Sequence, residues 1–212
     1  MRKLQLTTVV VFLISLMACQ PPVTFNEPQP ANTDNLSEFP KRLQGHYLSL
    51  LDNSTLTIDN NIIQKIYDYD YTLHPNQLDS NSRISGDTLI DVRINEKTPI
   101  KRVGDSLVAH IHYIETLFEM NDDNVVRKFK GYYFLNNRYN VESWQVKKME
   151  LSKGQLTISS IAVPTDIDNL KEITETPHDT VSQYQFTPTK KQFKAFIKNG
   201  GFSDNETFVR VK

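Results

Sequence analysis

Cysteine is nearly absent from this chain of 212 residues, which contains only Cys19. A single cysteine has no partner within the chain, so an intramolecular disulfide bond is excluded. Long apolar runs are missing too, because the stretch at residues 7–17 is shorter than the roughly 20 apolar residues that a membrane-spanning helix needs. The Gly-x-Ser-x-Gly and His-Glu-x-x-His motifs of hydrolases are also absent. The sequence therefore offers neither a disulfide framework nor a recognisable catalytic motif.

Neither sign of charge dominates the sequence, which has 24 Lys and Arg residues against 25 Asp and Glu residues. Two of the basic residues, Arg2 and Lys3, lie at the N-terminus, so the chain after residue 18 carries a net charge of about −3. The two signs are interspersed, without long runs of one sign. This balance gives no reason to expect binding to anionic lipid, and we predict no nucleic-acid partner.

Residues 1–18 have the layout of a secretory leader. A positive start precedes the apolar stretch at residues 7–17, and the small residue Ala18 precedes Cys19. The run Leu16-Met17-Ala18-Cys19 resembles the lipobox of bacterial lipoproteins, in which the thiol is acylated and the chain is cut just before it. The resemblance implies that residues 1–18 are a signal peptide and that palmitate-type lipid on Cys19 anchors the mature protein to a membrane. The alternative is an ordinary leader, or an uncleaved N-terminal anchor, with a chance cysteine.

Residues 19–38 are predicted to be a flexible tether. The segment contains four prolines among several Asn and Asp residues, so it has little apolar surface to bury. Some surface-displayed lipoproteins carry an acidic cluster directly after the cysteine, whereas the first acid here is Glu27. By that resemblance we expect the protein in the outer membrane of a bacterial cell envelope, facing the periplasm. The remaining residues, 39–212, suit a single β-rich domain with its own core.

Short strands separated by turn signals dominate residues 39–212. Asp59-Asn60-Asn61 and Gly104-Asp105-Ser106 each join two predicted strands, and such short loops favour antiparallel pairing because parallel strands need long crossovers. The predicted strands cover residues 43–51, 54–58, 62–71, 88–94, 100–103, 107–117, 125–135, 141–151, 155–163, 181–186 and 207–211.

Two short helices are predicted near the C-terminus. The first would be capped by Asp166 and would carry Leu170 on its apolar side. The second would open at Thr187-Pro188 and would bury Phe193 and Phe196. We therefore expect a mainly β fold, in which an antiparallel meander forms a barrel-like or strongly curved sheet with these helices packed on it.

Two wider resemblances follow from these patterns. Gly45-His46-Tyr47 resembles the Gly-x-Trp opening of lipocalins, but position 47 is Tyr and a strand follows the last predicted helix, which departs from the lipocalin order. The leader, the tether and the tyrosine-rich β pattern together resemble small lipoproteins of unknown function from the Bacteroidota. That resemblance implies a location and no activity.

Three tyrosines, Tyr67, Tyr69 and Tyr71, alternate along the predicted strand 62–71 and therefore share one face. A tyrosine ladder can bind a sugar or a peptide by stacking. The alternative is a sheet face that packs under a loop or a helix. We identify these three tyrosines and Trp144 as possible ligand-binding residues.

His110 and His112 lie two residues apart on a predicted strand, so they face the same side. Two imidazoles at this spacing can share a metal ion if further ligands come from elsewhere. Glu115 points to the opposite face and no cysteine is available to the domain, so we predict neither a metal site nor a cofactor.

We therefore predict a membrane-anchored envelope lipoprotein whose non-catalytic β domain binds a protein partner or an apolar small molecule. The alternatives are an enzyme or metal-dependent protein with a site near His110 and His112, and a structural envelope component. An open cavity lined by aromatic residues would favour a small molecule. A filled interior with an exposed apolar patch would favour a protein partner.

Overall fold

The computed structural model describes residues 22–175 and 184–211. In chain order the elements are β1 (Val23–Phe25), β2 (Gly45–Ser49), β3 (Thr55–Ile58), β4 (Ile62–Leu73), η1 (Pro75–Gln77), β5 (Ser82–Ser85), β6 (Thr88–Asp91), β7 (Glu96–Val103), β8 (Ser106–Glu119), β9 (Asn124–Phe129), β10 (Tyr132–Asn140), β11 (Ser143–Ser152), β12 (Gln155–Ser160), α2 (Pro164–Thr174), β13 (Tyr184–Phe186), α3 (Lys190–Lys198) and β14 (Asp204–Arg210).

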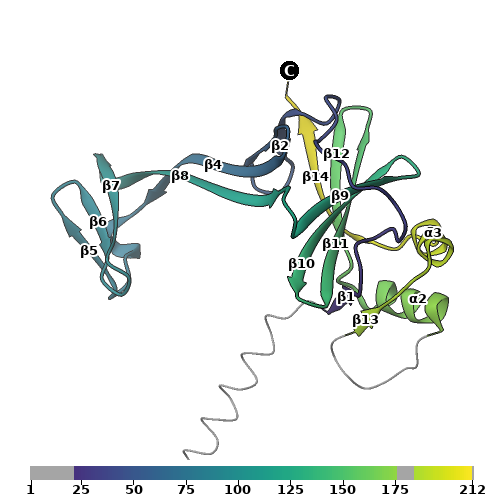
Figure 1. Cartoon of the computed structure of the whole chain (residues 1–212). Helices are drawn as coiled ribbons and strands as arrows, with labels where there is room; N and C mark the ends of the chain where they lie inside the picture. The colour runs from purple at the N-terminus through teal and green to yellow at the C-terminus, as the bar shows by residue number, and fades with distance from the viewer. Residues whose placement is uncertain (1–21, 176–183, 212) are drawn as a thin grey trace, which may run out of the picture.

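The described strands form one 14-stranded sheet, with the order β13-β1-β11-β12-β14-β2-β3-β4-β8-β7-β6-β5, while β10 pairs with both β11 and β9. The mainly β class and the two helices are confirmed. The prediction of a barrel-like sheet is wrong, because the strand order ends at β13 and at β5 and the sheet does not close. The sheet is also mixed, because β1 pairs in parallel with β13. The physical reason is visible in Figure 1, where β4 and β8 run outward and carry one end of the sheet away from the other.

The chain therefore has two regions, which we call the body and the arm (Figure 1). The arm is residues 67–113: a ribbon made of residues 67–72 of β4 and 108–113 of β8, and a tip made of residues 73–107. The body is the rest of the described chain. It holds two buried clusters, one around Tyr47 and Phe118 and one around Phe134 and Phe193. The tip has a small cluster of its own.

Residues 22–38, which were expected to be a flexible tether, are part of the body. Strand β1 joins the sheet between β11 and β13, and Phe25 is fully buried with its ring 6.2 Å from that of Phe193. Further along, the backbone N–H of Gln29 donates to Asn136 Oδ1 at 2.6 Å, and Asn136 Nδ2 donates back to the backbone carbonyl of Gln29 at 3.0 Å. The tether prediction is wrong for these residues because a few apolar side chains and one buried amide fix a segment whose average composition is polar.

The predicted strand 125–135 is two strands, β9 and β10, joined by a tight turn at Lys130-Gly131. Both turn residues have positive φ, 53° and 91°, which is the backbone of hairpin turns that match the twist of their strands. Residues 136–140, which lie between the predicted strands 125–135 and 141–151, instead continue β10. Strand β10 buries both of its faces, because Tyr133 and Leu135 pack in one cluster of the body and Phe134 packs in the other.

The two helices start slightly away from their expected caps. Asp166 lies in the first turn of α2, with Val163 at the N-cap. Helix α3 begins after Thr189, whose side chain and that of Gln192 form a capping box. Leu170, Phe193 and Phe196 are buried as expected, and they pack both helices against one face of the sheet.

Candidate interaction surface on the arm

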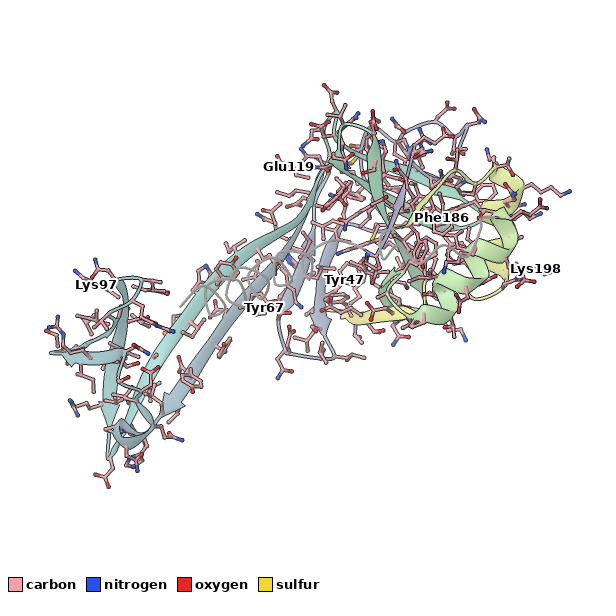
Figure 2. All side chains as sticks on the ribbon, turned by 90° about the horizontal axis from the view of Figure 1, so that it is seen from below. Tyr47, Tyr67, Lys97, Glu119, Phe186 and Lys198 are labelled. Carbon is pink, nitrogen blue, oxygen red and sulfur yellow. The ribbon has the colours of Figure 1, made fainter. Side chains whose placement is uncertain are left out.

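The arm contains a two-stranded ribbon with open backbone edges. Strands β4 and β8 pair continuously from Ile62↔Glu119 to Leu73↔Leu107. Strand β3 covers β4 only as far as Ile66, and β7 covers β8 only as far as Ala109. Among the described residues, no other strand pairs with residues 67–72 of β4 or 110–113 of β8. Figure 2 shows this ribbon reaching from Glu119 at the body, past Tyr67, to the tip that carries Lys97.

One face of the ribbon, which we call the aromatic face, consists of Tyr67, Tyr69 and Tyr71 from β4 with Ile111 and Tyr113 from β8. Tyr69, Tyr71 and Tyr113 are 49 %, 53 % and 58 % exposed, so much of this face is open to solvent. Tyr67 and Tyr113 lie directly opposite each other, with ring centroids 6.0 Å apart. Tyr113 was missed in the sequence because only the β4–β8 register places it beside the other tyrosines.

The opposite face, which we call the polar face, brings His110 and His112 against Asp68 and Asp70. His110 Nδ1 is 3.1 Å from Asp70 Oδ1, and His110 Nε2 is 3.4 Å from Asp68 Oδ1. The other oxygen of Asp68 lies 3.3 Å from His112 Nδ1. All four side chains are more than half exposed. Within the described parts of the chain, no group of three or more His, Cys, Asp or Glu residues is arranged to hold a metal ion.

A buried lysine, Lys65, lies on β4 in the body, two residues before the arm begins. Lys65 Nζ lies 2.9 Å from Asp52 Oδ2 in the β2–β3 turn and 2.6 Å from Glu206 Oε1 on β14. Burial alone would lower the pKa of Lys65, but hydrogen bonds to Glu206 and Asp52 outweigh it and raise that pKa above its ordinary value. Burial would likewise raise the pKa of Asp52, yet hydrogen bonds from Ser54 and Lys65 hold it well below its usual range. Lys65 and Asp52 are therefore both charged at neutral pH.

The far end of the ribbon is closed by the tip. Leu73, Ile100, Leu107 and Ala109 form its buried cluster, and Ile111 of the aromatic face packs against them. A cleft of about 340 Å³ lies beside this junction, where polar-face residues of the ribbon meet β7. The ribbon is thus held at both ends, and along it Tyr67 packs across the strands against Tyr113.

Trp144 lies elsewhere. It is 6 % exposed on β11 of the body, where the Arg138 guanidinium stacks over its ring at 4.4 Å. The structure therefore brings Tyr67, Tyr69 and Tyr71 together and leaves Trp144 apart from them.

A hollow of about 870 Å³ beside α2 is lined by polar residues, and the buried carboxylate of Asp166 there accepts hydrogen bonds from the amide and hydroxyl of Ser203.

Cys19 and the leader lie outside the described residues. Within the residues that the structure does describe, no helix combines the length and the apolar character needed to cross a bilayer. No protein-family model, curated protein or solved structure is significantly similar to this chain, so its function has to be argued from the geometry above.

Proposed function

We propose that this protein is a lipid-anchored component of the bacterial cell envelope and that it binds a protein partner through the arm. The observation that carries the proposal is the ribbon, on which Tyr69, Tyr71 and Tyr113 of the aromatic face are about half exposed. Exposed tyrosines supply contact area and hydrogen-bonding hydroxyls at a small entropic cost, which suits them to protein interfaces.

The distribution of apolar side chains supports a protein partner over an apolar small molecule. The two clusters of the body are filled by their own side chains, of which Tyr47, Phe134 and Phe193 are fully buried. The exposed tyrosines lie on a narrow ribbon, which cannot enclose a small ligand. A ribbon of this kind instead offers two faces and two edges to a partner of protein size.

The folding of residues 22–38 changes how such a protein would sit on its membrane. If lipid is attached to Cys19, only Gln20 and Pro21 separate it from Pro22, the first described residue. Three peptide steps span at most about 11 Å. The body would then lie close to the lipid surface, and the reach of the protein would come from the arm. Strands β1 and β13 lie at one end of the strand order and the arm at the other, so the anchor and the aromatic face are separated by the body.

The arm is tested by cross-linking in cells. A photo-reactive phenylalanine analogue replaces Tyr71 or Tyr113 on the arm, or Val141, which is 86 % exposed on the body. We expect the two arm positions to give one shared adduct that Val141 does not give. The partner, identified by mass spectrometry and purified, should bind the wild-type protein and lose affinity for a Tyr69→Ala/Tyr71→Ala variant. Adducts from Val141 alone, or equal affinity for the two proteins, would refute the proposal.

The anchor is tested separately by Cys19→Ala. The variant should lose labelling by a palmitate analogue and move from the membrane fraction to the soluble fraction, while its circular dichroism spectrum keeps the β signature. A variant that still labels and still partitions into detergent would show that the lipobox assignment is wrong. That result would leave the binding role of the arm unaffected.

A further inference from the structure

We infer that the free edge of β4 takes up an extended segment of a partner as an additional strand, and that this segment alternates basic and apolar side chains. The inference rests on the proposed function and specifies how the arm would bind. It follows from the backbone edge, from the two faces beside that edge, and from the charge on one of them.

The edge itself supplies the first part of the argument. Residues 67–72 of β4 pair with β8 on one side only, so alternate N–H and C=O groups on the other side have no strand partner among the described residues. At about 3.3 Å per residue this edge is roughly 20 Å long, which matches a strand of six residues. Proteins usually shorten, cover or twist such an edge, because it is a template for another strand. Adding a peptide strand to an exposed edge is a recurring way to recognise an extended segment.

The two faces beside the edge specify the side chains of that segment. An added strand continues the alternation of β4, so every second side chain would lie beside Tyr67, Tyr69 and Tyr71 and the others beside Asp68 and Asp70. The first set gains from being apolar, since it packs against exposed tyrosine rings. The second set gains from being basic. Asp68 and Asp70 are 56 % and 69 % exposed, and a carboxylate has more acceptor sites than the histidine contacts occupy.

The same charges argue against a second copy of this chain as the occupant. If two β4 edges paired with each other about a twofold axis, Asp68 and Asp70 of one copy would face the same carboxylates of the other. Like charges directly opposite each other on a sheet are destabilising. The carboxylates beside this edge therefore disfavour pairing with a second β4 edge and favour a strand that carries basic side chains.

The test uses the protein in a neutral detergent and synthetic decapeptides as probes. One peptide alternates Lys and Val, and a second alternates Glu and Val. Two further Lys/Val peptides carry backbone N-methyl groups, one on every Lys and the other on every Val. In an added strand only one of these two sets of N–H groups faces β4, so methylation of that set alone removes the new hydrogen bonds. Affinities are measured by fluorescence anisotropy.

We expect the Lys/Val peptide to bind at least about tenfold more tightly than the Glu/Val peptide. Asp68→Asn/Asp70→Asn should weaken its binding by about tenfold. The matched control Asp122→Asn/Glu142→Gln removes two exposed carboxylates from the body and should leave the affinity unchanged. One N-methylated peptide should lose binding while the other keeps it.

Three results would overturn the inference: no binding of the Lys/Val peptide, equal effects of the two double variants, or no difference between the two N-methylated peptides. The last would mean that the arm attracts cations without adding a strand. These failures are separable from failure of the proposed function. Cross-linking through Tyr71 and Tyr113 and the affinity of the purified partner do not depend on the peptide's charge or backbone.

Discussion

The body and the arm use the same kind of strand in opposite ways. In the body, strands carry apolar side chains that other elements cover, so that Phe134 on β10 is fully buried beneath α3 and its neighbours. In the arm, Tyr71 on β4 occupies an equivalent alternating position and is 53 % exposed. The body is therefore stabilised by burial of side chains. The ribbon of the arm is stabilised by cross-strand pairing and by its two anchored ends.

This difference indicates what each region is for. A two-stranded ribbon alone is marginally stable in water, so it needs support from the β3–β4 pairing at its base and from the cluster around Leu107 at the tip. Tyr69 and Tyr71 are about half exposed, so they bury less surface on folding than the fully buried rings of the body. Residues that do little for stability and remain exposed together are the ones expected to contact a partner.

The comparison is tested most strongly by truncating one aromatic ring in each region. The ring of Phe134 lies 5.1 Å from that of Phe193 and 6.0 Å from that of Phe202. Phe134→Ala should lower the free energy of unfolding by about 3–5 kcal/mol, because it removes a buried ring and leaves a cavity. Tyr71→Ala should change it by less than about 0.5 kcal/mol. Urea denaturation measures both, and similar losses for the two variants would contradict the division into body and arm.

The ion pairs of Lys65, in the body just before the arm, give the next largest effect. Lys65→Met should lower the free energy of unfolding by about 2–3 kcal/mol at neutral pH, because it leaves Asp52 and Glu206 without their shared cation. The estimate is below that for a fully buried pair because both carboxylates keep about a third of their side-chain exposure. The control Lys147→Met, at an exposed position, should have an effect within about 0.5 kcal/mol.

The pH dependence of the Lys65 effect has a definite sign. The pKa of Asp52 is lowered by folding, so its contribution is present above its ordinary pKa of 3.8 and is lost as the pH falls toward its folded value. The pKa of Lys65 is raised, so its contribution is complete below 10.5 and is lost only at higher pH. The difference between wild type and Lys65→Met should therefore be constant between about pH 5 and pH 9 and shrink in acid. A difference that grows as the pH falls below 4 would contradict the ion-pair account.

A buried amide tests whether residues 22–38 belong to the body. Asn136 donates to the carbonyls of Gln29 and Phe134 and accepts from the Gln29 amide. Asn136→Leu should lower the free energy of unfolding by about 2 kcal/mol, because it leaves buried backbone groups without partners. It should also speed proteolysis within residues 22–38. The control Asn137→Leu, at a partly exposed position whose side-chain amide donates to Asn124 Oδ1, should cost at most about 1 kcal/mol. Equal proteolysis of both variants would mean that the segment is not held by Asn136.

That segment shows where prediction from sequence failed. Average composition described residues 19–38 as polar and rich in proline, but folding of residues 22–38 depends on single side chains, chiefly Phe25 against Phe193 and Gln29 against Asn136. Each of these contacts joins residues more than a hundred positions apart. A window of local composition cannot detect them. The hairpin at Lys130-Gly131 was missed for a different reason. Apolar residues continue before and after the turn, and the turn itself has only one glycine to mark it.

The arm was predictable in its parts and not in its assembly. The alternation of Tyr67, Tyr69 and Tyr71 correctly placed them on one face, and the short turns correctly predicted the β3–β4 and β7–β8 pairs. The β4–β8 pairing has no local signal, because the whole tip lies between the two strands. Alternation also shows only that residues share a face. It does not show whether anything covers that face, which is what separates the arm from the body.

The smallest expected effect concerns the polar face. We predict that one equivalent of zinc leaves the melting temperature of the purified protein unchanged, and that His110→Ala/His112→Ala behaves like the wild type. A stable zinc site needs three or four ligands whose orientation is fixed by further hydrogen bonds. Here the imidazoles of His110 and His112 are 61 % and 54 % exposed, and their contacts are with Asp68 and Asp70, which are themselves exposed.

The two histidines do lie within 3.4 Å of carboxylate oxygens, so these four side chains could supply ligands to a metal ion and the prediction can fail. Tight binding of zinc to the folded state would raise its stability by a few kcal/mol at saturation. If that rise occurred and disappeared in His110→Ala/His112→Ala, a metal ion would be bracing the ribbon between its anchored ends. The arm would then have a source of rigidity of its own, comparable to the packing that stabilises the body. Its exposed tyrosines would lie on the face opposite the metal ion, and the carboxylates of Asp68 and Asp70 would be occupied by metal rather than available to the basic side chains of a partner strand.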